Sequence, residues 1–456
     1  MHSLKYPLSR RRFLQASAAG VAFGLESAAP LYAVSANGKL QHACIGVGGI
    51  GKLDRDRLGA HPKLEIVALC DVDRRNLEHA AEDYPAARTY TDWRELLAAE
   101  GDRIDSVNVS VPDHMHAPIT MTALLAGKHV YCQKPLCHNV AEVRAVTLAA
   151  TQTGAITQLG TQAAAQIGER MAVQLLREGV IGKIKRVYLC SNRPGAIESY
   201  RLAGPRPAQG ATPPDYLDWD LWIGAAPHRP YVPKIYHPVT WRAWQDFGTG
   251  WSGDMGCHIF DAVWKGLRLA TPRTIAAHVQ ESWKDDPRRR ADTWPQSDHI
   301  LWTFPGNEMT AEDELVIEWH DGKFLPPREI RQIIERENYP TECALVLGTE
   351  GAMLIPRGNE PELFPSKKFK DHPRPELPPR DHYHHYIDAC LGGEPTESHF
   401  AQTGPMTEAI LLGTVAIRAP DVTLQWNAAN MKLPNHPAAE EYLRRTYRPG
   451  WQVAGL

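Results

Sequence analysis

The sequence lacks several features that would define its class at once. Its 456 residues include 50 Lys and Arg against 53 Asp and Glu, a formal net charge of −3, so it has no concentrated positive field for nucleic acid or an acidic membrane. The eight cysteines are scattered, without a disulfide framework or a CxxC pair. After the N-terminal region no apolar run is long enough to cross a bilayer. These absences argue against a nucleic-acid-binding protein, a disulfide-stabilised scaffold and an integral membrane protein.

The length and the N-terminal region divide the chain into parts. A chain of 456 residues with 43% hydrophobic residues is too long for one ordinary core, and we expect two folded domains. Residues 1–36 contain the cluster SRRRFL, then an alanine-rich, mildly apolar segment, which is the order of a twin-arginine export signal. The alternative is a disordered basic tail. We expect the twin-arginine machinery to deliver a folded, cofactor-loaded protein to the periplasm, with no membrane association after processing.

Residues 40–155 alternate short apolar runs with helical patterns. This alternation predicts βαβ units and the doubly wound parallel sheet of a Rossmann dinucleotide-binding domain. The first strand-to-helix turn has the GxGxxG pattern, in which glycine permits a tight turn and a close approach of the backbone to a pyrophosphate. The residues of this turn are Gly46, Gly48, Gly49, Ile50 and Gly51.

An acidic residue, Asp71, follows the second predicted strand, twenty residues after Gly51. A carboxylate there can accept hydrogen bonds from both ribose hydroxyls of NAD and repels the 2′-phosphate of NADP. Arg74 lies nearby in the sequence, so NADP is disfavoured rather than excluded. A glycine-rich turn with a solvated aspartate is the alternative, and the surrounding strand–helix pattern favours NAD.

The end of the fourth predicted strand faces the crevice where such sheets bind ligands. Ser110, Pro112 and His116 are expected on its nicotinamide side. His114 and His116 also form an HxH pair, but no third ligand follows at a recognisable spacing, and we expect no metal.

Lys134 follows the next predicted strand, between Gln133 and Pro135. Proline biases the residue before it toward an extended conformation, which would direct the lysine into the same crevice. An ammonium group beside the nicotinamide can polarise a substrate hydroxyl for hydride departure. The alternative is a surface lysine whose aliphatic stem covers apolar neighbours.

The second half of the chain has a different pattern. Residues 156–385 contain several alternating strands without intervening helices, which predicts a broad, mostly antiparallel sheet with one exposed face that can support dimerisation. Residues 386–456 are expected to form a C-terminal helix and tail that return toward the first domain. Gln162, near the domain junction, is a further candidate for cofactor or substrate binding.

A tryptophan- and proline-rich insertion in this half precedes a helix expected to begin near Ser252 or Gly253. Asp254 and His258 are then one turn apart on one face. A carboxylate in that position can fix the tautomer of the imidazole and make it a competent general base. A helix-terminal acid beside a packed histidine is the alternative.

The sequence resembles the Gfo/Idh/MocA oxidoreductase family in three motifs: GxGxxG with Asp71, the tripeptide QKP and the segment GDMGCHIFD. The resemblance covers nearly all of the chain after the export signal. It implies a Rossmann domain, an open-faced α/β domain and a homodimer or homotetramer. It also implies that Lys134, Asp254 and His258 form the catalytic group. Gln133 stands where the family usually has a glutamate before the catalytic lysine. The N-terminal export signal is similar to that of an exported branch of the family.

The function expected from this resemblance is that of an NAD-dependent oxidoreductase acting on a sugar or polyol hydroxyl, with the cofactor retained and recycled. The tryptophan-rich insertion suits sugars, and its candidate substrate-binding residues are Tyr236, His237, Trp241 and Arg242. A redox-neutral, NAD-dependent glycosidase that oxidises, eliminates, hydrates and reduces is one alternative. A non-catalytic sugar- or NAD-sensing protein is another.

Overall fold

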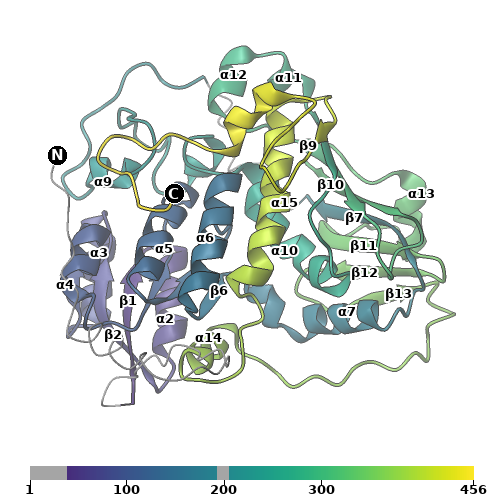
Figure 1. Ribbon diagram of the computed structural model, residues 1–456, viewed down its shortest axis with the longest axis horizontal. Coiled ribbons are helices and arrows are strands. Elements are labelled where there is room, and N and C mark those ends of the chain that lie inside the picture. Colours follow the sequence, from purple (N-terminus) through teal and green to yellow (C-terminus); the bar gives the residue numbers. More distant parts are fainter. Residues whose placement is uncertain (1–37, 193–204) are drawn as a thin grey trace, which may run out of the picture. The chain divides into compact units, whose positions relative to one another are not determined.

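The computed structural model describes residues 38–192 and 205–456 (Figure 1). The export signal expected at residues 1–36 lies outside the described residues. No helix in the described ranges is long and apolar enough to cross a membrane.

The first lobe is a six-stranded parallel sheet with the order β3-β2-β1-β4-β5-β6. Its strands are β1 (Leu40–Ile45), β2 (Leu64–Cys70), β3 (Arg88–Tyr90), β4 (Ser106–Val109), β5 (His129–Cys132) and β6 (Thr157–Leu159). The helices of this lobe are α2 (Ile50–Gly59), α3 (Arg74–Asp83), α4 (Trp93–Glu100), α5 (His116–Leu125) and α6 (Val140–Thr153), with the 3-10 turns η1 (Asp113–Met115) and η2 (Gln162–Ala165). This is the predicted Rossmann topology, and β6 extends the sheet past the expected boundary at residue 155.

The second lobe is built on an eight-stranded sheet with the order β13-β12-β11-β7-β10-β9-β8-β14. Its strands are β7 (Ile184–Ser191), β8 (Thr274–Val279), β9 (Asp298–Pro305), β10 (Glu314–Asp321), β11 (Glu342–Gly348), β12 (Ala352–Pro356), β13 (Glu362–Phe364) and β14 (Leu424–Gln425). Among these pairs only β7 and β10 are parallel. The mostly antiparallel sheet predicted from the sequence is therefore confirmed.

The remaining helices lie on one face of this sheet, at its edges or against the first lobe. They are α7 (Ile167–Arg177), α9 (Trp219–Ile223), α10 (Gly250–Gly266), α11 (Glu281–Lys284), α12 (Pro287–Asp292), α13 (Arg328–Arg331), α14 (His382–Cys390) and α15 (Phe400–Arg418), with η3 (Thr240–Ala243), η4 (Gln332–Ile334) and η5 (Pro437–Leu443). Helix α10 begins at Gly250, slightly before the start expected from the sequence.

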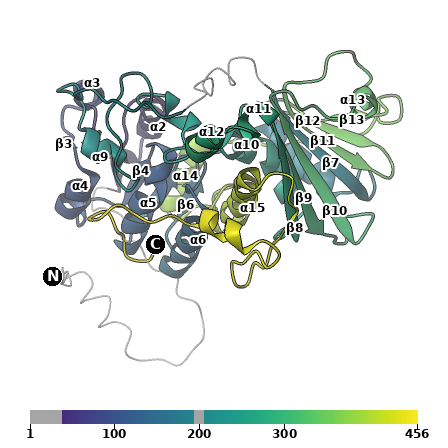
Figure 2. The ribbon, with the colours of Figure 1, turned by 90° about the horizontal axis from the view of Figure 1, so that it is seen from above.

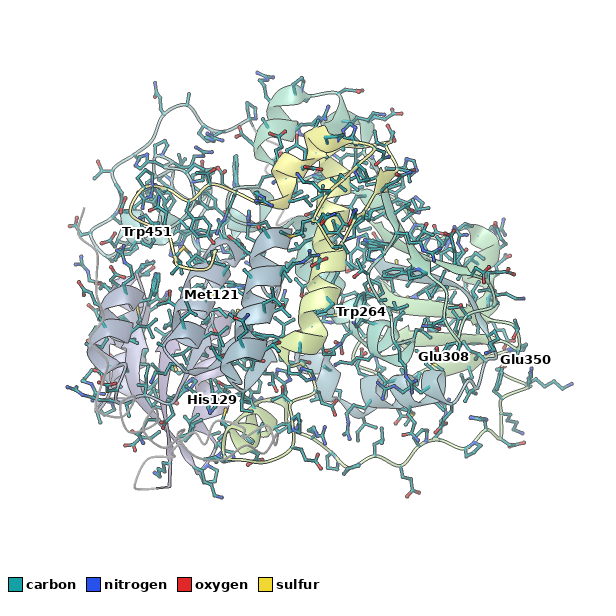
Figure 3. All side chains as sticks on the ribbon, in the orientation of Figure 1. Met121, His129, Trp264, Glu308, Glu350 and Trp451 are labelled. Carbon is teal, nitrogen blue, oxygen red and sulfur yellow. The ribbon has the colours of Figure 1, made fainter. Side chains whose placement is uncertain are left out.

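Only one face of the large sheet packs on the long helices, as Figure 2 shows from above. Residues of β9 alternate between buried and partly exposed, with Ile300, Trp302 and Phe304 in the core. Trp264 of α10, labelled in Figure 3, packs edge-to-face on Phe304 at a ring separation of 6.0 Å. The opposite side chains of β9, including His299, lie on the open face.

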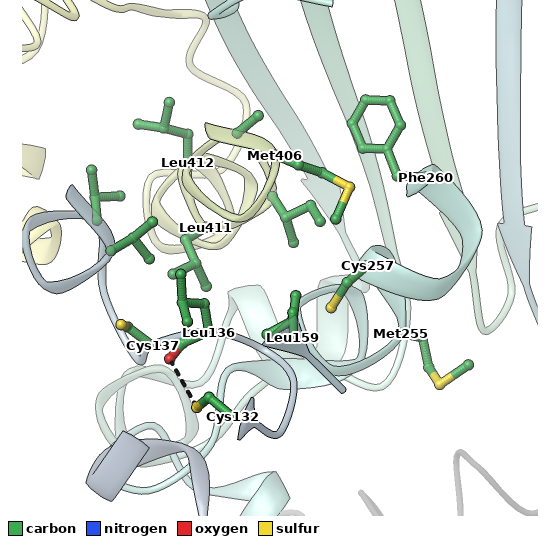
Figure 4. Close-up of a cluster of buried hydrophobic side chains, with 14 of the residues drawn as sticks. Cys132, Leu136, Cys137, Leu159, Met255, Cys257, Phe260, Met406, Leu411 and Leu412 are labelled. Atoms are coloured by element: carbon green, nitrogen blue, oxygen red, sulfur yellow. Dashed lines mark hydrogen bonds between the residues drawn. The ribbon is translucent and has the colours of Figure 1, made fainter. Parts of the chain in front are cut away.

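Helix α15 lies between the two lobes (Figures 1 and 2). Its Glu408 pairs with Arg144 of α6 at 2.6 Å, and the Nε1 of Trp302 donates a hydrogen bond to its Ala409 carbonyl at 2.8 Å. The buried side chains that join the end of β5 to α10 and α15, drawn in Figure 4, are Cys132, Leu136, Cys137, Leu159, Met255, Cys257, Phe260, Met406, Leu411 and Leu412. This shared core fixes the loop that carries Lys134 relative to the helix that carries Asp254.

Candidate active site

A cleft of about 880 Å³ opens at the carboxyl ends of β1, β2, β4 and β5 and is closed on its far side by α10. In a sheet of this topology the strand order reverses between β1 and β4, which is where ligands bind. The predicted residues that line the cleft are Gly46, Gly48, Gly49, Ile50, Asp71, Ser110, Pro112, Gln133, Lys134, Gln162, His237, Trp241, Arg242, Asp254 and His258. The fold thus brings the glycine turn and the α10 motif to one site.

The glycine turn leaves no room for side chains on its inner side. A Cβ at Gly46, which has a φ of 82°, would lie 2.2 Å from the carbonyl oxygen of Ser110. A Cβ at Gly51 would lie 2.2 Å from the carbonyl oxygen of Gly46, so Gly51 packs behind the turn. Within the described part of the chain no side chain caps α2 at Gly49, and the N-terminus of this helix can face a phosphate. The turn therefore fits the pyrophosphate of a dinucleotide.

Asp71 ties the end of β2 to this turn. Its Oδ2 accepts hydrogen bonds from the backbone N–H of Val47 at 3.0 Å and of Gly48 at 3.3 Å, and its Oδ1 accepts one from the N–H of Asp73 at 2.9 Å. Burial raises the pKa of Asp71, and these backbone donors oppose that rise. The carboxylate lines the cleft beside the turn, which is the position that a ribose diol requires.

Lys134 and Asp254 form an ion pair across the cleft. The Nζ of Lys134 contacts Oδ1 of Asp254 and donates a hydrogen bond to its backbone carbonyl at 3.0 Å. The Nε of Arg242 lies 3.4 Å from the other carboxylate oxygen, Oδ2. Only 16% of the Lys134 side chain and 10% of the Asp254 side chain are exposed. The lysine from the first lobe and the carboxylate from the second are therefore held in direct contact.

The charges around Asp254 decide its ionisation. Burial disfavours its charged form, but the positive charges of Lys134 and Arg242 outweigh this effect and lower the pKa of Asp254 to about 2. His258 follows one turn later on α10, is 4% exposed and lines the cleft. Its interaction with Asp254 also favours the carboxylate. The role expected of Asp254 in orienting this imidazole stays a prediction, because the hydrogen bond and ion pairs described for the carboxylate are with Lys134 and Arg242.

Asp113 is a cleft residue that the sequence reasoning missed. It begins η1 directly after Pro112, is 3% exposed and accepts a hydrogen bond from Thr249 Oγ1 at 2.8 Å. Burial, followed by the negative charge of Asp254, raises the pKa of Asp113 to about 7. A carboxyl group that titrates near neutral pH in a cleft is able to exchange protons with a substrate.

An Asp113→Asn variant should lose part of the pH dependence of its stability. The folded protein holds the Asp113 proton up to about pH 7, whereas an unfolded chain releases it near pH 4. The stability that this proton provides is therefore present below about pH 4 and is lost as the pH rises through 7, on the order of 1–4 kcal/mol. Thermal unfolding at pH 4.5 and pH 7.5 should show a smaller decrease in Tm for the variant than for wild type. Equal decreases in both proteins would contradict the raised pKa of Asp113.

A second buried carboxylate, Asp54 of α2, explains the environment of Gln133. The Gln133 amide donates hydrogen bonds to both oxygens of Asp54, at 3.0 and 2.8 Å, and Ser110 Oγ and the Tyr383 hydroxyl also donate to them at 2.7 and 3.1 Å. Burial raises the pKa of Asp54 to about 6, while these donors favour its ionised form. A buried carboxylate of α2 thus fixes the Gln133 side chain, directly before Lys134 in the sequence.

Four predicted site residues do not line the cleft. Gly51 lies behind the turn, and Arg74 is exposed on α3, where its neighbour Arg75 lines the cleft instead. His116 is buried, with Nδ1 2.6 Å from the Pro135 carbonyl oxygen and Nε2 2.8 Å from that of Val111. It therefore connects the loops on either side of the site.

Tyr236 is the fourth of these residues. It is 1% exposed and packs against Trp219, Trp244 and Phe247 at ring separations of 5.1 to 5.8 Å. The aromatic ring of Tyr236 is part of the core of the insertion. This packing explains why the residue does not line the cleft, although it was predicted to bind a sugar.

The tryptophans of the insertion divide between packing and lining. Trp222, Trp241 and Trp251 line the cleft, while Trp219 and Trp244 pack in the core of the insertion. All five are less than 10% exposed. The histidines of the HxH pair contact different backbone carbonyls: His114 Nε2 lies 3.0 Å from that of Trp222, whereas His116 contacts those of Pro135 and Val111.

The fold and the cleft are those of a Rossmann lobe for a dinucleotide joined to a separate α/β lobe. The family described as "Oxidoreductase family, NAD-binding Rossmann fold" matches residues 40–161, and "Oxidoreductase family, C-terminal alpha/beta domain" matches residues 170–287. The chain belongs to the Gfo/Idh/MocA oxidoreductase family.

Curated relatives match parts of the chain. It is 30% identical over 198 residues to a glycosyl hydrolase family 109 protein of Stenotrophomonas maltophilia, covering 39% of this chain and 41% of that protein. It is 31% identical over 137 residues to D-apiose dehydrogenase of Paraburkholderia graminis, covering 29% of this chain and 36% of that protein. It is 35% identical over 102 residues to inositol 2-dehydrogenase of Corynebacterium glutamicum, covering 21% of this chain and 28% of that protein. The chain thus spans less than half the length of each of these relatives.

Solved structures share the fold. The aldose–aldose oxidoreductase from Caulobacter crescentus, complexed with glycerol, has a TM-score of 0.55 and 18% identity, covering 85% of this chain and 99% of its own. The WlbA dehydrogenase from Bordetella pertussis, in complex with NADH and UDP-GlcNAcA, has a TM-score of 0.57 and 15% identity, covering 85% and 99%. At these identities the likeness concerns the fold alone.

Proposed function

We propose that this protein is an NAD-dependent oxidoreductase that acts on a hydroxyl group of a sugar or polyol. The observation that carries the proposal is that Lys134 from one lobe and His258 from the other line one cleft with the glycine turn. Dehydrogenation of an alcohol needs a group that stabilises the developing alkoxide and a group that accepts its proton. An ammonium and an imidazole meet these two needs.

The residues of the chain divide the work as follows. Bound NAD supplies a hydride acceptor at its nicotinamide ring. Lys134 donates a hydrogen bond to the substrate oxygen, and His258 takes the proton from that oxygen. Asp254, ionised at every working pH because its pKa is about 2, holds the ammonium of Lys134 in place. Trp241, stacked on Arg242 at 4.2 Å, offers an apolar face to a sugar ring.

We propose NAD rather than NADP as the cofactor. The Asp71 carboxylate, which lines the cleft beside the glycine turn, supports this choice because an acid at the end of the second strand repels a 2′-phosphate. Arg75, a cation that lines the cleft four residues after Asp71, is engaged by Asp73 at 2.7 Å and by the ring of Tyr216 at 3.5 Å, so its charge is already compensated. Both features favour a free ribose diol.

The cellular setting remains part of the proposal. The SRRRFL cluster supports export by the twin-arginine route to the periplasm, where free NAD is scarce, so that the cofactor stays bound and is recycled within each catalytic cycle. The open face of the large sheet supports a homodimer or homotetramer.

A second candidate activity is a redox-neutral glycosidase. In this cycle a hydroxyl is oxidised, the glycosidic substituent is eliminated from the neighbouring position, water is added and the ketone is reduced, with no net change in the cofactor. Such a cycle needs more proton transfers than a simple dehydrogenation, and Asp113, with a pKa of about 7, provides a second proton carrier beside His258. The similarity to a protein named as a glycosyl hydrolase of family 109 also favours it.

One experiment tests both activities. Purified protein is acid-quenched to quantify bound NAD and NADP, and native protein is incubated with a panel of sugars and glycosides while sugar release and NADH absorbance are followed together. Lasting NADH formation indicates a dehydrogenase, and sugar release without a net absorbance change indicates the hydrolytic cycle. Stoichiometric NAD with no turnover of any compound would overturn the enzymatic proposal and favour a sugar- or NAD-sensing protein.

A further inference from the structure

Three histidines lie side by side on the open face of the large sheet. The strand registers place His278 of β8 opposite His299 of β9, and His299 opposite His320 of β10. The rings of His299 and His320 stack at 4.3 Å with an interplanar angle of 17°, and those of His278 and His299 lie 5.8 Å apart. None of these histidines lines the catalytic cleft.

A carboxylate joins two of these imidazoles. Oε2 of Glu318 lies 2.8 Å from Nε2 of His299 and 3.2 Å from Nε2 of His320. A carboxylate oxygen of Asp or Glu is a common third protein ligand of zinc beside two histidines. One ligand atom from each of the three residues lies within 4.8 Å of the other two. Ligand atoms of a tetrahedral zinc site are separated by about 3.3 Å, which is close to the two distances from Oε2 of Glu318.

The second oxygen of Glu318 is held by a different partner. Arg186 Nε on β7 lies 2.6 Å from Oε1, which leaves Oε2 directed at the two imidazoles. Outer hydrogen bonds of this kind orient the carboxylate ligands of metal sites. The positive charge of Arg186 opposes binding of a cation, while its hydrogen bond fixes the carboxylate.

Two of these three residues are buried. His320 is 3% exposed and Glu318 is 5% exposed. The Nε2 of His320 faces the Glu318 carboxylate at 3.2 Å, and its Nδ1 has no hydrogen-bond partner within residues 38–192 and 205–456. The two imidazoles and the carboxylate therefore form a preformed group of ligand types that bind a metal ion.

We propose that His299, Glu318 and His320 bind one zinc ion on the open face of the sheet, with water in the fourth position. Two imidazole nitrogens and one carboxylate oxygen favour zinc over calcium or magnesium, which prefer oxygen ligands alone. The ion bridges β9 and β10 at a position that is separate from the catalytic cleft. This inference does not depend on the proposed enzymatic activity.

The test measures zinc binding directly. Tag-free protein is treated with a chelator, dialysed and titrated with zinc chloride at pH 7.5 by calorimetry, and its Tm is measured with and without zinc. Wild type should bind one equivalent of zinc and gain thermal stability. His299→Ala and Glu318→Gln should each weaken zinc binding at least ~100-fold, because mutation of a residue that only hydrogen-bonds a metal ligand already costs up to that much affinity. Binding should also weaken in acid, because protons compete with zinc for the imidazole nitrogens.

His278→Ala is the matched control. It removes a histidine in the same register on the next strand, but His278 is half exposed and hydrogen-bonded to Asp421 at 3.0 Å, so the variant should bind zinc as wild type does. Circular dichroism and retention of bound cofactor check that each variant is folded. A wild type that binds no zinc, or zinc binding that is unchanged in folded His299→Ala and Glu318→Gln, would overturn the site and leave Glu318 as part of a polar network.

Discussion

A Lys134→Met variant should keep its bound cofactor and lose at least ~10²-fold in kcat, the loss found when one donor to a developing oxyanion is removed. Lys134 reaches the cleft from the end of β5, whereas the glycine turn that would hold the dinucleotide follows β1. The measurement compares kcat with the fraction of bound NAD after acid quenching. Lys52→Met is a suitable control, because Lys52 is exposed on α2 and pairs with Asp56 on the surface.

The variant also tests whether Lys134 is only structural. Its removal takes from the buried Asp254 carboxylate the closer of its two described ion pairs, and breaking a buried ion pair costs about 3 kcal/mol. The double variant Lys134→Met, Asp254→Asn removes both charges and should recover much of the lost Tm without recovering turnover. Recovery of turnover together with stability would show that Lys134 does not act on the substrate.

The ion pair between Lys134 and Asp254 illustrates what the sequence could and could not predict. Both residues were predicted for the site from their motifs. The sequence reasoning paired Asp254 with His258, because residues one turn apart on a helix are the neighbours that spacing reveals. A contact between residues 120 positions apart depends on how the two lobes pack, and no local pattern contains that information.

Two buried carboxylates were missed for a related reason. An aspartate in a helix is usually read as a solvated residue. Asp54, however, shares the inner face of α2 with Gly51 and Leu58, at positions i+3 and i+7 from Gly51, and this periodicity was a usable signal for its burial. Asp113 had no such signal, because its burial comes from Thr249 and α10, which are distant in the sequence.

The alternation of β9 was a clearer signal in the sequence than the first residue of α10. The alternation of apolar and polar residues in β9 predicts a half-buried strand without any information from the rest of the fold. Helix α10 starts at Gly250 although glycine disfavours helix. Gly253 and Gly256 allow close packing there, since an added Cβ would lie 2.5 Å from Thr249 and 3.0 Å from Ile410. Tertiary packing therefore overrides the local preference at the end of the helix that carries the catalytic candidates.

A His258→Asn variant should lose ~10²–10⁴-fold in kcat, the usual contribution of a general base, while its fold and bound cofactor are retained. His258 lies inside α10 and is 4% exposed, so asparagine fills much of its space and avoids a large cavity. The measurement is kcat as a function of pH for wild type and variant, with bound NAD quantified in both. His61→Asn, a 7% exposed histidine outside the cleft, is the control for the loss of a buried imidazole.

The combination of this variant with Lys134→Met separates a joint catalytic role from two independent ones. Groups that act on the same oxygen in one transition state are strongly non-additive, so the double variant should be only slightly slower than the slower single variant. If the losses multiply instead, the ammonium and the imidazole act at different steps or on different atoms. Near-normal turnover in His258→Asn would move the proton-accepting role to Asp113, whose carboxyl titrates near pH 7 in the same cleft.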